Sequence, residues 1–143
     1  MLASITPPNA PTQDSSLDAV LESMRTFPDG YWNEGSGGAT IEWVDEAGSR
    51  EMMTIAPDFE EKTFYLKVHA FDGRRVTETW LSLWDRARLT EVFEVTDDYF
   101  ASKGLFVPAE KAAECVHCFA TRGKRSSAVE WITPTDVPPE GNY

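Results

Sequence analysis

The chain has 143 residues, of which 41% are hydrophobic and 12% aromatic, and its formal net charge is −11. This length suits one domain, and this hydrophobic content is typical of a folded chain rather than a disordered one. The negative charge disfavours direct binding to nucleic acid or to an anionic membrane surface, because both reward basic proteins. No stretch of about 18 apolar residues predicts a membrane helix, and no signal-peptide pattern opens the chain, so we expect a cytoplasmic protein.

The first 38 residues predict a leader, a helix and a loop. Residues 1–15 are rich in Pro, Ser, Thr, Asn and Gln, which predicts a disordered leader. Ser15 or Ser16 is the expected N-cap of a short helix that ends before residues 27–30. Its apolar stripe is formed by Leu17, Val20, Leu21 and Met24. Residues 31–38 contain three glycines and two large aromatic residues, which predicts an irregular loop.

Two hairpins are expected in the middle of the chain. The first joins residues 39–45 to residues 51–56, each with alternating apolar positions. The second, residues 63–83, is predicted to be the central hairpin, with a tight turn at its Asp72-Gly73 step. The core face of its first arm is formed by Phe64, Leu66, Val68 and Ala70. The end of its second arm is apolar on both faces, which predicts a position deep in the sheet.

The remaining elements are two strands, a loop and a helix. Residues 89–95 predict a fifth strand, and residues 96–104 predict a surface loop. Pro108 and Gly123 mark the start and the end of the clearest helix in the sequence. Residues 127–132 then predict a last strand.

These elements predict a single α+β domain over residues 16–133. We expect a mainly antiparallel sheet of five to six strands, with an N-terminal and a C-terminal helix packed on it. Residues 1–15 would precede this domain as the disordered leader, and residues 134–143, which contain three prolines, would follow it as an extended tail.

The motif Cys115-Val116-His117-Cys118 is the only cluster of redox-active or metal-binding residue types in the sequence. A CxxC redox pair needs its first cysteine at a helix start, where free N–H groups stabilise the thiolate, and this motif falls within the predicted helix. A zinc site would need His69 as a distant fourth ligand and neighbouring positions of one helix as the others. We therefore expect structural cysteines and a surface histidine, with no catalytic residue, cofactor or metal.

The acidic residues are concentrated in the first half of the chain, which suggests a binding role. Residues 1–61 hold 12 acidic and 2 basic residues, whereas residues 62–143 hold 12 and 11. We expect the carboxylates of the first hairpin and the following connection to share one edge or end of the sheet and to attract a protein with a basic surface. Aromatic residues exposed beside this field would be the anchors, and the alternative for each of them is that it covers an end of the core. The predicted partner-binding residues are Glu42, Asp45, Glu46, Glu51, Glu60, Glu61, Trp32, Asp97, Asp98 and Tyr99.

The C-terminal segment FVPAEKAAECVHCFATRGKRSSAVEW, residues 106–131, contains a Val-Pro helix start, an Ala-rich helix, a glycine turn and a Val-x-Trp strand. The residues that form this pattern are Val107-Pro108, Ala112-Ala113, Phe119, Thr121-Arg122-Gly123 and Val129-Glu130-Trp131. This segment resembles the closing segment of immunity proteins of bacterial polymorphic toxin systems, a family often paired with deaminase or nuclease toxins. The resemblance implies a small α+β protein that binds and occludes its own toxin and has no catalytic residues.

Charge and resemblance together favour an immunity protein that neutralises a cognate toxin by occluding its active site, with no enzymatic activity of its own. The first alternative is an acidic secretion chaperone or adaptor, which would bind an extended segment of an effector protein as an obligate dimer. The second is a small hydrolase-like enzyme that uses a cleft near His69. The acidity also has a simpler interpretation, as a means of keeping the protein soluble.

Overall fold

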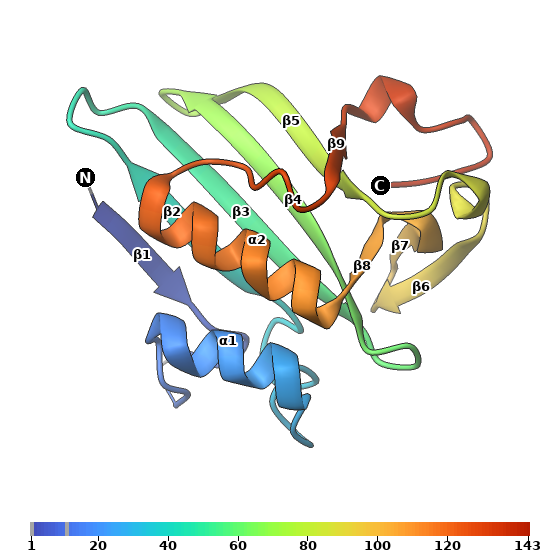
Figure 1. Ribbon diagram of the computed structural model, residues 1–143, viewed down its shortest axis with the longest axis horizontal. Helices are drawn as coiled ribbons and strands as arrows, with labels where there is room; N and C mark the ends of the chain where they lie inside the picture. Colours follow the sequence, from blue (N-terminus) through green and yellow to red (C-terminus); the bar gives the residue numbers. More distant parts are fainter. Residues whose placement is uncertain (1, 11) are drawn as a thin grey trace.

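The computed structural model describes residues 2–10 and 12–143. Its main sheet is antiparallel, with strand order β1-β2-β3-β4-β5-β9, and the short strand β8 also pairs with β4 (Figure 1). These strands are β1 Leu2–Thr6, β2 Ala39–Val44, β3 Arg50–Asp58, β4 Thr63–Asp72, β5 Arg75–Leu83, β8 Phe106–Pro108 and β9 Glu130–Ile132. The predicted α+β class and the predicted single domain are confirmed.

Two helices cover one face of this sheet, and a small second sheet lies on the other. The helices are α1 Leu17–Thr26 and α2 Ala109–Arg122, and α2 crosses strands β2 to β4 with α1 beside it (Figure 1). The second sheet pairs β6 Val92–Thr96 with β7 Tyr99–Ser102. Three short 3-10 turns connect these elements: η1 Arg86–Arg88, η2 Lys103–Leu105 and η3 Pro134–Asp136.

The central hairpin forms as the alternation of its sequence predicts. Phe64 and Leu66 point towards the helices and are fully buried, whereas Tyr65, between them on β4, belongs to a separate core on the other face. Asp72 pairs with Arg75, so the two turn residues are Gly73 and Arg74. The turn therefore lies one position later than expected. Gly73 has a φ of 62° there, a left-handed conformation that favours glycine.

Helix α1 begins and ends at the residues that its sequence indicates. The Ser16 side chain accepts a hydrogen bond from the backbone N–H of Ala19 at 3.1 Å, which satisfies one of the free donors of the first turn. The helix ends at Phe27, in a left-handed conformation with a φ of 47°. The predicted apolar stripe faces the sheet, and Val20 and Met24 are fully buried in the core.

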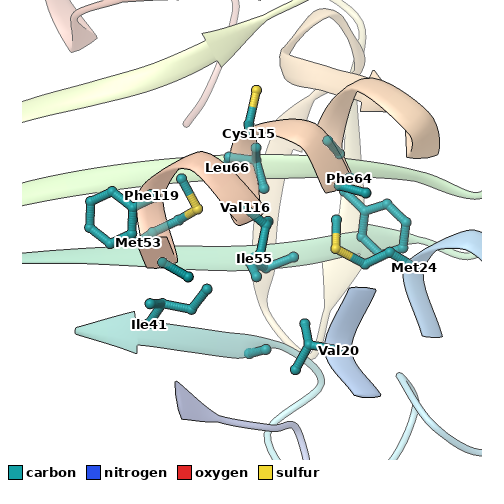
Figure 2. Packing of buried hydrophobic residues seen from close by; sticks show 14 of the residues in the cluster. Val20, Met24, Ile41, Met53, Ile55, Phe64, Leu66, Cys115, Val116 and Phe119 are labelled. Carbon is teal, nitrogen blue, oxygen red and sulfur yellow. The ribbon is translucent and has the colours of Figure 1, made fainter. Parts of the chain in front are cut away.

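Helix α2 packs on the sheet through its own apolar stripe. Figure 2 shows Val116 and Phe119 directed towards Ile41, Met53 and Ile55 on the neighbouring strands. Each of these five side chains has no exposed surface. Burial of an aliphatic or aromatic side chain contributes about 1.5–3 kcal/mol, so this contact is a substantial source of stability on the helical face.

The segment between β5 and α2 differs from the prediction. Residues 96–104 were expected to form a loop, but β7 occupies residues 99–102 and turns back on β6 through Asp97 and Asp98. The expected fifth strand at residues 89–95 is shifted to Val92–Thr96 and lies in the small sheet. This hairpin covers Tyr65 and contributes to the second core, which consists of Tyr65, Leu81, Leu83, Leu89, Val95, Ala101, Leu105, Phe106 and Ile132.

The prediction of a disordered leader over residues 1–15 is wrong for the described residues of that range; residues 1 and 11 lie outside the description. Residues 2–6 form β1, which pairs with β2 so that Ile5 lies opposite Ile41, and Ala3 and Ile5 pack against the main core. After it, the Pro8 carbonyl accepts a hydrogen bond from the backbone N–H of Ser36 at 2.9 Å. The domain therefore begins before residue 16.

The C-terminal tail, residues 134–143, is not simply extended. It opens with η3 and then returns to the small sheet. There the backbone N–H of Ser102 donates to the Asn142 carbonyl, and the N–H of Asn142 donates to the Ser102 hydroxyl, both at 2.9 Å. These bonds make the tail part of the domain.

The junction between α2 and the sheet yields a stability prediction. Gly123 and Gly73 have φ values of 66° and 62°, so alanine at either site adopts a left-handed conformation at a cost of roughly 1–2 kcal/mol. A Cβ at Gly123 would overlap the Trp43 ring, whereas a Cβ at Gly73 meets nothing within 4 Å. We expect Gly123→Ala to lower the unfolding free energy by about 1–3 kcal/mol more than Gly73→Ala in urea denaturation. Equal losses would contradict the close contact at Trp43.

Candidate functional site

The ten predicted partner-binding residues do not share one edge or end of the sheet. Asp45 and Glu46 lie in the turn between β2 and β3, whereas Glu60 and Glu61 lie in the turn between β3 and β4. These two turns are at opposite ends of β3, which has 9 residues and therefore spans about 30 Å. The expectation of one continuous acidic edge is wrong.

The two carboxylates within the first hairpin also point in different directions. Glu51 pairs in register with the buried Trp43 and so lies on the helical face, where burial raises the pKa of its carboxyl. Glu42 lies on the other face and accepts a hydrogen bond from the guanidinium of Arg50 at 2.8 Å. The first hairpin therefore presents no single acidic surface.

Trp32 is buried and is not the exposed anchor that the sequence suggested. Only 1% of its surface is exposed, and its indole N–H donates to the Ser23 carbonyl at 3.2 Å. Its ring packs on Phe64 at a centroid distance of 5.1 Å. A tryptophan whose polar group and ring are both satisfied inside the protein closes the core beneath the loop of residues 31–38.

Above Trp32, three segments meet around a cleft of about 440 Å³, which we call the acidic cleft. Its lining residues are Trp32, Asn33, Gly35, Ser36, Gly37, Phe59, Val95, Thr96 and Asp97. None of these described residues is basic, and Glu34 and Glu60 directly adjoin them in the chain. The cleft thus combines the carboxylate of Asp97 with other polar groups and with the apolar side chains of Phe59 and Val95.

Phe59 is one of the exposed aromatic residues that the sequence analysis did not select. It lines the acidic cleft from the turn between β3 and β4, and 41% of its surface is exposed. Its ring contacts Phe27 edge-on at 5.7 Å, so one side is supported by the protein and the other faces solvent. A single aromatic residue between Pro-Asp and Glu-Glu is an ordinary loop pattern, and its exposure follows only from the fold.

A buried ion pair fixes the turn that carries Phe59. Asp58 is 2% exposed, and its carboxylate lies 2.7 Å from the ammonium of Lys103. The other carboxylate oxygen accepts hydrogen bonds from the backbone N–H groups of Glu60 and Glu61. Because every oxygen of this buried carboxylate has a partner, the turn is held in one conformation.

Glu61 is bound within the protein, whereas Glu60 is not. Arg88 contacts both carboxylate oxygens of Glu61, at 3.1 and 3.0 Å, and Lys103 lies 3.3 Å away. Hydrogen bonds from Arg88 and then Lys103 hold the pKa of Glu61 at about 2. Among the described residues Glu60 belongs to no ion pair and is exposed, so it remains available to a partner.

The remaining predicted residues, Asp97, Asp98 and Tyr99, lie around the turn between β6 and β7. Asp97 lines the acidic cleft, and Asp98 turns the chain with a φ of 59°. Tyr99 is half-buried and does not line the cleft. Its ring centroid lies 5.4 Å from the ammonium of Lys67. Of the predicted set, Trp32 and Asp97 line the cleft, and Glu60 adjoins the lining residue Phe59 in the chain.

The cysteine and histidine side chains are not arranged for redox or metal chemistry. Cys115 is fully buried within α2, and burial raises the pKa of its thiol to about 11, opposite to what a reactive cysteine needs. His69 is half-buried beside Phe71, and burial and the neighbouring Lys67 lower its pKa. Among residues 2–10 and 12–143, no group of three or more His, Cys, Asp or Glu side chains could hold a metal ion.

No helix in the described part of the chain has the length and apolar character needed to cross a membrane. Comparison of the chain with family models, with curated proteins and with solved structures gives no match.

The pairing of Glu61 predicts a specific dependence of stability on pH. The pKa of this carboxyl is about 2 in the folded protein, against an ordinary value of 4.5. The unfolded chain binds the proton first as the pH falls, so the stability from this carboxylate is present above pH 4.5 and lost towards pH 2. We expect Glu61→Gln to make the decline in unfolding free energy across this range less steep, as measured by urea denaturation.

The matched control is Glu60→Gln, which removes the adjacent exposed carboxylate and leaves the pairs of Arg88 and Lys103 intact. This variant should retain the decline of the unaltered protein. A decline in Glu61→Gln as steep as in Glu60→Gln would show that the pairing does not contribute to acid stability.

Proposed function

We propose that this chain is an immunity protein, which binds a cognate bacterial toxin and neutralises it by occluding the toxin's active site, without catalytic turnover or a cofactor. The observation that carries the proposal is the position of Phe59, a solvent-facing aromatic side chain on the rim of the acidic cleft. Aromatic anchors surrounded by polar rims dominate the energy of many protein interfaces. The geometry therefore favours recognition of another protein.

The charge of the cleft indicates what kind of partner it accepts. Asp97 lines the cleft, Glu60 adjoins Phe59, and neither is neutralised by an ion pair within the described residues. Such a rim attracts lysine or arginine side chains and accelerates encounter with a basic protein. Toxins that act on nucleic acid present basic surfaces to their substrate, so a protein that covers this surface competes directly with the substrate.

The segment that resembles immunity proteins supports the proposal because it forms part of the scaffold of the domain. Residues 106–131 form β8, α2 and the start of β9, and Val107 and Phe119 within them are fully buried. The helix of this segment packs against the sheet in the main core. None of the segment's residues lines the acidic cleft. The resemblance thus concerns the framework, and the partner is selected by the residues of the cleft.

One observation favours the secretion chaperone as a second candidate. β9 pairs with β5 only from Leu81 to Leu83, and in the described part of the chain no strand pairs with residues 75–80 on that side. Val76 on this open edge is 44% exposed. An extended segment of an effector could add to such an edge as a further strand.

The acidic cleft yields a prediction about association rate. The partner for this test is the cognate toxin, which the proposal expects the neighbouring reading frame to encode. We expect the double variant Glu60→Lys/Asp97→Lys to slow association at least tenfold and to weaken its dependence on salt, as measured by stopped-flow mixing, because it reverses the charge of the cleft. The matched control, Asp45→Lys/Glu46→Lys, makes the same change in net charge at the other end of β3 and should retain most of the rate. Equal slowing by both variants would mean that only net charge matters.

The exposed aromatic residue yields a prediction about affinity. We expect Phe59→Ala to weaken toxin binding by at least about 30-fold, equivalent to about 2 kcal/mol, mainly through faster dissociation. Val76→Ala is the control, because Val76 has a similar exposed fraction on the edge of β5. The same variants should be compared in a growth-arrest assay with the toxin gene. Loss of binding in Val76→Ala alone would instead support the chaperone function, as would a dimer in light scattering.

A further inference from the structure

On the face of the sheet opposite the helices, the side chain of Lys67 is surrounded by three tyrosine rings. Its ammonium lies 5.5 Å from the ring centroid of Tyr65, 5.4 Å from that of Tyr99 and 5.8 Å from that of Tyr143. These rings come from β4, from β7 and from the C-terminal tail, so the fold brings together three distant parts of the chain. We call these four residues the tyrosine cage.

Lys67 differs from the other partly buried cations in having no carboxylate beside it. Four basic side chains in the described part of the chain are partly buried: Arg50, Lys67, Arg88 and Lys103. The other three form ion pairs with carboxylates at distances of 2.7 to 3.0 Å. Removing a cation from water without an anion is unfavourable, and burial lowers the pKa of Lys67 accordingly. The faces of the tyrosine rings offset only part of this cost.

Tyr65 provides a second group without a partner in the same place. It is 1% exposed, its ring packs against Phe106 at 5.6 Å, and its hydroxyl makes no hydrogen bond within the described residues. A buried hydroxyl without a partner loses its bonds to water and gains nothing in return. Burial, and then the adjacent hydroxyl of Tyr99, which lies outside hydrogen-bond geometry, raise the pKa of Tyr65, so this group stays protonated at neutral pH.

We propose that the tyrosine cage binds a small oxyanion, supplied as a phosphate or a carboxylate group. The ammonium of Lys67 provides the positive charge and the phenol hydroxyls provide donors, which together form charge-assisted hydrogen bonds to oxygen. Tyr143 is 43% exposed and Lys67 is only partly buried, so the cage is open to solvent. This site shares no residue with the lining of the acidic cleft, so it stands or falls independently of the proposed toxin binding.

The first test titrates the full chain with inorganic phosphate and, separately, with acetate, at an ionic strength kept constant with sodium chloride. We expect one of the two anions to raise the melting temperature in a saturable manner, since a ligand that binds only the folded state stabilises it. The same anion should shift the side-chain nitrogen resonance of Lys67 in NMR spectra. A response to phosphate identifies a phosphate site and a response to acetate a carboxylate site. No saturable response to either anion would overturn the proposal.

The second test uses substitutions that separate binding from stability. Tyr31 has the other buried hydroxyl without a hydrogen-bond partner, so Tyr31→Phe and Tyr65→Phe remove equivalent groups. Both variants should fold with a melting temperature at least equal to that of the unaltered protein in the absence of anion. Only Tyr65→Phe should weaken the affinity for the anion, by tenfold or more, and Lys67→Met should abolish it. An unchanged anion affinity in Tyr65→Phe or in Lys67→Met would overturn the proposal.

Discussion

The sheet depends on one buried serine at the point where β4 changes its neighbour. β4 pairs with β8 from Thr63 to Tyr65 and with β5 from Lys67 onwards, so Leu66 lies between the two ladders. The hydroxyl of Ser82 accepts the N–H of Leu66 and donates to the carbonyl of Leu105, both at 2.9 Å. Ser82 is fully buried, and loss of its hydroxyl would leave two buried backbone groups unsatisfied, at about 1–3 kcal/mol each.

This change of neighbour also explains why both candidate sites border the β6–β7 hairpin. When β8 replaces β5 beside β4, the chain between them is directed onto the face opposite the helices, where β6 and β7 cover Tyr65. Asp97 and Tyr99 are two residues apart in this hairpin. Asp97 lines the acidic cleft, whereas Tyr99 forms part of the tyrosine cage. One short hairpin therefore contributes a residue to each of the two proposed sites.

Local sequence patterns predicted most of the fold, and the failures arise where distant segments meet. The cap at Ser16 and the end of α2 at Gly123 depend on nearby residues, and both form as predicted. β1 was missed because its ladder to β2 is set by residues more than 30 positions away, while the following prolines dominate the local composition. Trp32 was misjudged for the same reason, since its ring packs on Phe64, which is 32 positions away in the sequence. The separation of the acidic residues between the two ends of the sheet could have been predicted, because successive turns of a hairpin series lie at opposite ends of their strands.

Screening decides how much of the net charge of −11 acts at the acidic cleft. At physiological ionic strength the Debye length is about 8 Å, far less than the roughly 30 Å that separates the two ends of β3. Asp45 and Glu46 therefore contribute little to the potential felt by a partner at Phe59, whereas Glu60 and Asp97 act at contact distance. Under the proposed function, the overall charge would favour the approach of basic proteins, and the turn fixed by Asp58 would determine where they bind. The proposed recognition would thus depend more on the position of a few carboxylates than on their number.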